Sequence, residues 1–185
     1  MRESILVSRS KSWICEGLIE SMLKKDYDQI TIKEIAANSG VSSRTIYRHF
    51  SSKDKILMTH IDYLFADQII RDIDNDNVNI KDELTALCNF ILKHKQFFKL
   101  VYEAKKFYLL NDFFNKLSII GLNTLSPLDK NFAYQNVFYF EYNKKFFESV
   151  LTNLMEVWIK NDFKETPDEL ALVVIQFIES LSRLI

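Results

Sequence analysis

The sequence predicts an all-α protein, with an N-terminal three-helix domain followed by a larger helical domain. Only three Gly and two Pro occur among 185 residues, fewer than a sheet protein with many tight turns would need. Hydrophobic residues make up 48% of the chain, and along most of it they recur every three or four positions. These two observations favour long helices, and the length is sufficient to bury an ample core.

The first helix is expected over about residues 4–25, where apolar and charged side chains occupy opposite faces. The second is expected over 32–39. Thr31 and Glu34 have the spacing of a capping box, in which the hydroxyl bonds the first-turn amides and the carboxylate bonds back.

A short third helix is expected over 43–50. Gly40 stands where a helix commonly ends on a left-handed residue, and Ser42 can cap the next helix. Ile46 and Phe50, four residues apart, would share the face that packs on the core. The remaining side chains of this helix would then point elsewhere.

A long fourth helix is expected over about 53–72, and the Asp- and Asn-rich stretch 72–79 predicts a break. Further breaks are expected at Ser126-Pro127 and Thr166-Pro167. Between these breaks the periodicity predicts helices over about 80–94, 96–109, 111–122, 131–161 and 167–184.

Two short helices joined by a tight Gly-containing turn are typical of the helix-turn-helix, whose second helix enters the major groove of DNA. Arg44 is the best candidate for reading a base, because a guanidinium can donate two parallel hydrogen bonds to guanine. Tyr47 could contact a base or a phosphate, whereas Thr45, His49 and Lys53 are better suited to phosphate oxygens. The charge of the N-terminal region also favours DNA binding, since residues 1–55 hold ten Lys and Arg against seven Asp and Glu.

The segments 32–36 (IKEIA), 40–42 (GVS) and 45–53 (TIYRHFSSK) resemble the DNA-binding signature of the TetR family of bacterial transcription regulators. The resemblance covers about residues 5–60. It implies a homodimer that binds double-stranded operator DNA of palindromic sequence. It also implies DNA contacts by Thr31, Ser42, Ser43, Arg44, Thr45, Tyr47, His49 and Lys53.

The resemblance also implies a domain division, with DNA binding in residues 1–53 and effector binding and dimerisation in residues 54–185. At the end of the chain, 158–163 and 166–169 are similar to regulators resembling the dihydroxyacetone-kinase activator. This second likeness concerns one branch of the family only.

Fourteen of the fifteen Phe residues lie beyond residue 60, so the C-terminal domain should have an aromatic interior. Such a series could line a pocket for a small-molecule effector, or it could be ordinary core packing. The candidate pocket residues are Phe97, Phe98, Tyr102, Phe107 and Phe113.

The last two helices carry apolar stripes that are wider than one buried face requires. A monomer could cover both sides with its own helices, but pairing with the same helices of a second copy gives a closed two-fold assembly. The candidate dimerisation residues are Val150, Leu154, Trp158, Val173 and Phe177.

Other classes of function find little support in the sequence. Cys15 and Cys88 lack the spacing of a zinc site, and the three His residues have no partners at helical spacing, so neither a metal nor a cofactor is expected. No glycine-rich phosphate loop or hydrolase motif occurs, and we expect no catalytic residues and no enzyme. Neither a long uncharged apolar run nor a signal peptide is visible, which favours a cytoplasmic protein without a membrane segment.

Two functional hypotheses follow. In the first, the protein is a repressor that an effector releases from its operator. In the second, it is a TetR-like DNA-binding adaptor controlled by a protein partner.

Overall fold

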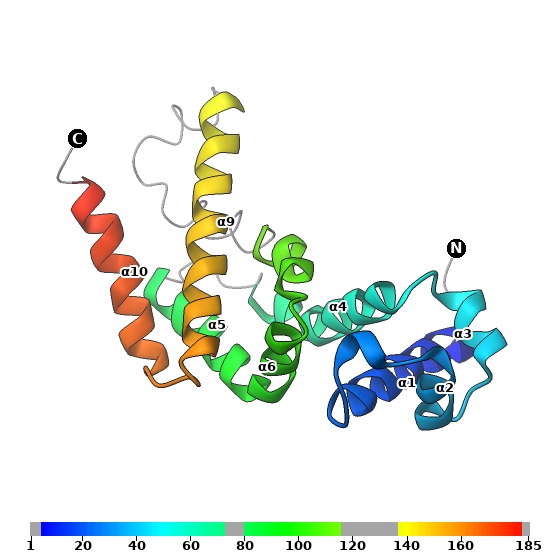
Figure 1. Ribbon diagram of the computed structural model, residues 1–185. Coiled ribbons are helices and arrows are strands. Elements are labelled where there is room, and N and C mark those ends of the chain that lie inside the picture. Colours follow the sequence, from blue (N-terminus) through cyan, green and yellow to red (C-terminus); the bar gives the residue numbers. More distant parts are fainter. Residues whose placement is uncertain (1–4, 73–79, 116–136, 183–185) are drawn as a thin grey trace. The chain divides into compact units, whose positions relative to one another are not determined.

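The computed structural model describes residues 5–72, 80–115 and 137–182, and every regular element in these ranges is helical (Figure 1). The all-α prediction is therefore confirmed. The chain forms two compact units. The first comprises Met1–Asp74 together with Glu103–Leu110, and the second comprises Asn75–Tyr102 and Asn111–Ile185.

The first unit is built on helix α1, Ile5–Met22, which packs against α2, Ile32–Ser39, and α4, Lys53–Asp72. Helix α3, Ser43–His49, packs against α2. The apolar stripes predicted from the sequence face inward and form a core of Ile14, Leu18, Ile35, Ile46, Ile56 and Leu57, each fully buried. Burial of this apolar surface drives the packing of helices as short as α2 and α3, which would be marginal alone.

Helices α1 and α2 approach each other closely at Gly17. A Cβ atom at this position would lie 2.8 Å from the Cβ of Ser39 and 2.9 Å from its backbone nitrogen. Ser21 Oγ donates to the Gly17 carbonyl, and Asn38 Nδ2 donates to Ser21 Oγ at 2.8 Å. A glycine and two small polar side chains thus fix the contact between the two helices.

The first unit also contains a segment from much later in the chain, Glu103–Leu110, which we call the insert. Its 3-10 helix η2, Phe107–Leu110, packs against α4. The predicted continuous helix over 96–109 is therefore wrong, since α6 covers Lys95–Glu103 and then ends. Lys105 has φ of 55°, a left-handed conformation that interrupts a right-handed helix.

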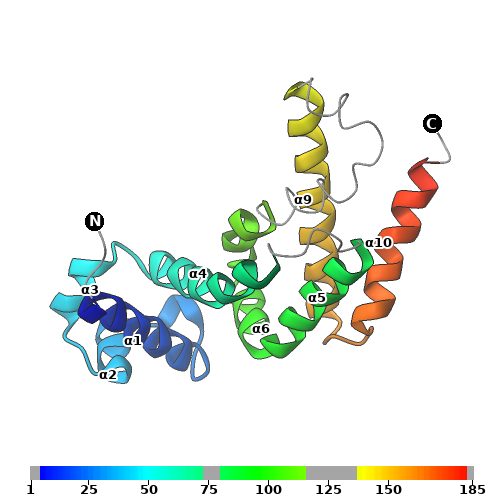
Figure 2. The same cartoon turned by 180° about the vertical axis from the view of Figure 1, so that it is seen from behind.

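The second unit contains α5, Ile80–Lys93, then α6, and the long α9, Val137–Lys160, and α10, Pro167–Ser182. Figures 1 and 2 show α10 beside α5, against which it packs. Phe146 of α9 stacks on Phe177 of α10, with ring centroids 6.2 Å apart. The core is strongly aromatic, as predicted, and includes Phe90, Phe97, Phe98, Phe113, Phe114, Phe147 and Trp158.

A tight turn joins α9 to α10. Asp162 and Phe163 both have positive φ, and the amide of Phe163 donates to the carbonyl of Trp158 at 2.9 Å, which closes the end of α9. Thr166 and Glu169 then form a capping box at the start of α10. The predicted break at Thr166-Pro167 is confirmed.

Other predicted boundaries are met only in part. Residues 111–115 are helical, as expected for the helix over 111–122, and α9 covers most of the helix expected over 131–161. The rest of these two predictions, the Ser126-Pro127 break and most of the 72–79 break lie outside the described residues. The domain boundary predicted after Lys53 stays a prediction; that residue begins α4, and the first compact unit includes this helix.

Candidate nucleic-acid interface

The turn between α2 and α3 has the geometry that the sequence predicts. Gly40 ends α2 in the left-handed region with φ of 68° and ψ of 16°. Ser42 caps α3, and its Oγ accepts the amide hydrogen of Thr45 at 3.1 Å and lies 3.0 Å from Thr45 Oγ1. Gly40 therefore ends α2 and the Ser42 cap begins α3 only two residues later, which makes the turn between the two helices tight.

Helix α3 divides its side chains between the core and the solvent. Ile46 is fully buried and Phe50 nearly so, whereas Arg44, Tyr47 and Arg48 are exposed. Tyr47 exposes 67% of its surface. The exposed face of α3 therefore presents two guanidinium groups and a phenol to solvent.

The other predicted DNA-contacting residues of this helix lie at its margins. Ser42 is exposed, and Ser43, Thr45 and His49 are half-buried. The His49 ring meets the ring of Phe50 edge to face, and its Nε2 lies 3.4 Å from the Arg48 guanidinium. Because Ser42 and Ser43 have short side chains, the backbone at the start of α3 can be approached closely by DNA.

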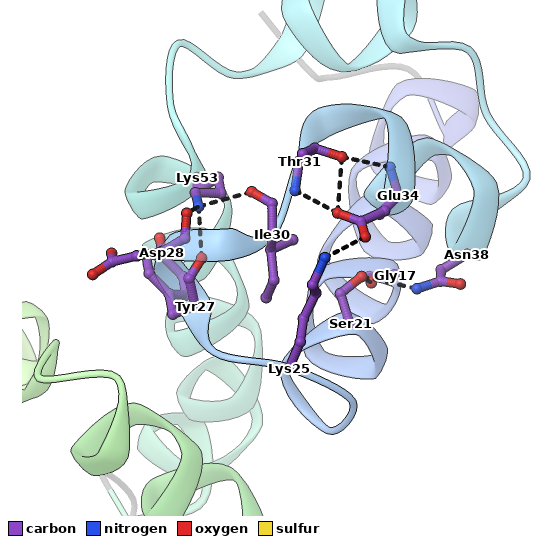
Figure 3. A network of polar contacts seen from close by, with 10 residues as sticks. All are labelled: Gly17, Ser21, Lys25, Tyr27, Asp28, Ile30, Thr31, Glu34, Asn38 and Lys53. Carbon is purple, nitrogen blue, oxygen red and sulfur yellow. Dashed lines mark hydrogen bonds and ion pairs between the residues drawn. The ribbon is translucent and has the colours of Figure 1, made fainter.

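Thr31 is the N-cap of α2 and forms both halves of the predicted capping box (Figure 3). Its Oγ1 accepts the Glu34 amide at 3.3 Å, while its own amide and hydroxyl donate to Glu34 Oε2 at 2.8 Å. Lys25 Nζ donates to Glu34 Oε1 at 2.6 Å. The Lys25 ammonium and the two Thr31 donors lower the pKa of Glu34 to about 2.

Lys53, predicted to contact a phosphate, is engaged within the protein (Figure 3). Its ammonium donates to the carbonyls of Tyr27 at 2.6 Å and Ile30 at 2.8 Å, at the end of the 3-10 helix η1, Tyr27–Gln29. Partial burial lowers the pKa of this ammonium. The structure thus assigns Lys53 and Thr31 to holding the start of α2, and a phosphate contact by either residue stays a prediction.

Sequence reasoning missed a polar cluster in the same unit. Asp54, at the start of α4, accepts hydrogen bonds from Tyr27 of η1 and from Lys106 and Tyr108 of the insert. In the sequence Lys106 and Tyr108 lie 52 and 54 positions after Asp54. No local pattern could have revealed these pairings.

The candidate pocket residues are divided between the two units. Phe97, Phe98, Tyr102 and Phe113 belong to the second unit, and Phe107 belongs to the insert in the first. The four Phe side chains are buried, and Tyr102 is half-buried. Within the second unit, Phe98 contacts Phe97 and Phe90 edge to face.

The candidate dimerisation residues also differ in exposure. Val173 and Phe177 on α10 expose 53% and 41% of their surfaces, and Val150 and Leu154 on α9 are half-buried. Trp158 is only 1% exposed, and its indole N–H donates to the Glu165 carbonyl at 2.9 Å. Trp158 therefore packs in the core of its own chain and bonds the turn that follows α9.

This turn, with an exposed and partly basic second helix, defines a helix-turn-helix DNA-binding protein. Residues 14–58 match the family model described as "Bacterial regulatory proteins, tetR family", and residues 78–180 match one described as "Transcriptional regulator C-terminal region". The chain belongs to the TetR family and is a DNA-binding transcriptional regulator. The resemblance to the dihydroxyacetone-kinase branch stays a prediction, since neither description names a branch.

One similar solved structure is that of the fatty acid degradation regulator FadR from Bacillus halodurans, with 18% identity and a TM-score of 0.59 over 95% of each chain. At this identity the likeness supports the fold alone. The search of curated proteins gave no match. Within the described residues, none of the helices has the length and apolarity needed to span a bilayer.

Proposed function

We propose that this regulator is a homodimeric repressor that binds a palindromic operator and is released by a small-molecule effector. The observation that carries the DNA-reading part is the exposed face of α3, where Arg44 and Tyr47 project from a helix fixed by Gly40, Ser42 and the buried Ile46. A rigid helix with an open N-terminal half can place side chains against base edges in the major groove.

Within this proposal the residues divide into three groups by task. Arg44 reads a base, and Tyr47 contacts a base or a phosphate. Ser42, Ser43, Thr45 and His49 contact the sugar-phosphate backbone and set the register of α3 in the groove. Lys53 and Thr31 act chiefly by holding α2, because their polar groups already have partners in the protein.

The exposed apolar side chains of α9 and α10 support the homodimer. Val157, Val173 and Phe177 each leave about half of the side chain in solvent, although apolar surface of this size is usually covered. Pairing of these helices with a second copy would bury it and present two α3 helices to successive major grooves. Half-sites would then lie about 34–36 Å apart, or a multiple of that distance.

The aromatic interior of the second unit supports an effector site. Phe, Tyr and Trp rings form adaptable apolar walls, and a ligand that favours a different arrangement of the dimer would reduce operator affinity. Because the operator lies on the chromosome, we expect the protein to act in the bacterial cytoplasm.

The first experiment is selection of bound duplexes from a random-sequence DNA pool by the purified chain. We expect an inverted repeat to be enriched. Arg44→Ala should then lose about 1–3 kcal/mol of discrimination at one position of each half-site, measured by competition between the enriched duplex and single-base variants. Lys164→Ala, which removes an exposed charge in the second unit, is the control.

Enrichment of no duplex at low ionic strength would overturn the DNA-reading proposal. Enrichment of a sequence without two-fold symmetry would overturn the palindromic dimer but not DNA binding. In vitro transcription from a promoter that overlaps the enriched site tests repression, since the proposal requires fewer transcripts when the protein is added.

A further inference from the structure

The cluster around Asp54 joins three separate parts of the chain within the first unit. Asp54 Oδ1 accepts the Tyr27 hydroxyl at 2.6 Å, and Oδ2 accepts the Tyr108 hydroxyl at 3.0 Å and the Lys106 ammonium at 3.2 Å. One carboxylate at the first turn of α4 therefore receives one donor from η1 and two from the insert. Here these four residues are called the Asp54 cluster.

The cluster continues toward the DNA-reading helices. The ammonium groups of Lys106 and Lys53 lie 5.1 Å and 4.7 Å from the centroid of the Tyr27 ring. Lys53 in turn bonds the carbonyl of Ile30, the residue before the Thr31 cap of α2 (Figure 3). Hydrogen bonds thus join the insert to Asp54, Asp54 to the Tyr27 side chain, and Lys53 to the carbonyls of Tyr27 and Ile30, just before the cap of α2.

Loss of the hydrogen bond from Lys106 or from Tyr108 should leave the Asp54 carboxylate less well satisfied. The side chains of Asp54 and Lys106 are only 33% and 20% exposed, so water can replace a lost partner only in part. Partial burial by itself would raise the pKa of Asp54, but the hydrogen bonds from Tyr27, Lys106 and Tyr108 outweigh it and lower that pKa. The cluster therefore favours the charged carboxylate in its present arrangement.

The insert is connected in sequence to the second unit at both of its ends. The chain passes from the second unit through Glu103–Leu110 into the first unit and returns to the second unit at Asn111. The insert is therefore covalently attached at both ends to the unit that carries the aromatic core.

We propose that Lys106 and Tyr108 are positioning residues for DNA binding, which act on the helix-turn-helix through their hydrogen bonds to Asp54. Docking of the insert holds the start of α4, η1 and the cap of α2 in the arrangement that binds DNA. Withdrawal of the insert removes two donors from Asp54 and loosens that arrangement. This inference rests on the DNA-binding function proposed above.

The first test compares duplex affinities, with the duplex enriched by the wild-type chain as probe. Lys106→Met and Tyr108→Phe should each raise the Kd by about three- to tenfold, as expected for a hydrogen bond to a partly exposed charge. Lys106→Arg should restore most of the affinity. Lys105→Met, which removes an exposed neighbouring charge, is the matched control and should bind as the wild type does.

The salt dependence of binding separates positioning from direct contact. A lysine that neutralises a phosphate contributes about 0.9 to the slope of log K against log salt concentration. Lys106→Met should leave this slope unchanged while lowering the affinity at every salt concentration. A smaller slope would show that Lys106 contacts DNA, and the positioning role would be wrong.

The second test uses the reciprocity of coupled equilibria. If docking of the insert favours DNA binding, DNA binding must favour docking by the same factor. Addition of the enriched duplex should therefore slow amide hydrogen exchange in residues 103–110 of the wild-type chain, and Asp54→Asn should reduce this protection. Residues 80–93 of α5, which belong neither to the insert nor to the proposed dimer interface, serve as the control peptide.

Unchanged Kd values for both folded variants, or unchanged exchange of the insert on DNA addition, would overturn the inference. If Lys106→Met does not fold, as judged by its melting curve, Tyr108→Phe decides the first test because it removes a single hydroxyl. Failure of the wild-type chain to bind any duplex would instead contradict the proposed function.

Discussion

At the scale of single residues, two glycines illustrate different physical requirements. Gly40 has φ of 68°, yet nothing lies within 4 Å of the place where its Cβ would be, so only backbone conformation demands glycine there. Gly17 has ordinary helical geometry, but a Cβ would press on Ser39 and on the Ile35 carbonyl oxygen at 3.0 Å. One position needs freedom of the backbone, and the other needs space.

Substitutions at the two glycines should therefore respond differently to the side chain introduced. Gly40→Ala should lower the free energy of unfolding by about 1–2 kcal/mol, and Gly40→Asn by less, because Asn tolerates the left-handed region. Gly17→Ala should cost about 1–3 kcal/mol despite the better helix propensity of Ala, and Gly17→Asn should cost more. Urea denaturation measures all four, with Glu16→Ala on the exposed side of α1 as control. Equal costs for Ala and Asn at both sites would contradict the distinction.

At the scale of elements, a capping box begins both α2 and α10. Capping boxes of Thr and Glu begin α2 at Thr31 and α10 at Thr166. The box of α2 has an added lysine, since Lys25, in the segment that follows α1, bonds Glu34. The cap of α2 therefore also ties α2 to the segment that follows α1.

The cap of α2 should make stability depend on pH in the acid range. Because the folded pKa of Glu34, about 2, lies below its ordinary value, the carboxylate stabilises the fold above that ordinary value. This contribution should disappear as the pH falls toward 2. The difference in melting temperature between the wild type and Glu34→Gln should accordingly shrink between pH 5 and pH 2.

A nuclear magnetic resonance titration checks the cause of this shift. Lys25→Met should raise the pKa of Glu34, because the largest contribution to its lowering comes from the Lys25 hydrogen bond. Lys33→Met, on the exposed side of α2, should leave that pKa close to its wild-type value. The same pKa in all three proteins would show that the ion pair does not form in solution.

At the scale of the whole molecule, α9 and α10 carry several large apolar side chains that are exposed in the single chain. Phe146 and Phe177 stack on each other and remain 53% and 41% exposed, and Val173 lies on the same helix as Phe177. Exposed apolar surface on adjoining helices is typical of an interface with another chain. A two-fold pairing would place each of these residues in the interface twice.

Charged substitutions on α10 test the proposed dimer. Val173→Glu and Phe177→Glu should each convert the protein to monomers in sedimentation experiments, since a two-fold interface would bury two unpaired carboxylates. Duplex affinity should fall at the same time. Leu23→Glu, at a similarly exposed apolar side chain of the first unit, should remain dimeric and is the control. Monomeric wild-type protein at micromolar concentration would contradict the dimer directly.

The sequence predicted the helix-turn-helix in detail because its determinants are local. The spacing of Thr31 and Glu34, the glycine at position 40 and the cap at Ser42 act over three or four residues. The prediction was wrong beyond residue 103, where hydrophobic periodicity favoured a helix through residue 109 but α6 ends. Lys105 instead adopts a left-handed conformation, and the residues after it bond Asp54 and pack on α4.

The sequence by itself determined the all-α fold, the two helices of the helix-turn-helix and the aromatic character of the C-terminal half, because caps, turns and hydrophobic spacing are properties of short segments. The tertiary structure alone decided that Lys53 holds η1, that Trp158 belongs to the core, and that Lys106 and Tyr108 join the first unit. Each of these outcomes depends on groups brought together from distant parts of the chain, and the partner that satisfies a buried polar group cannot be known until the helices have packed.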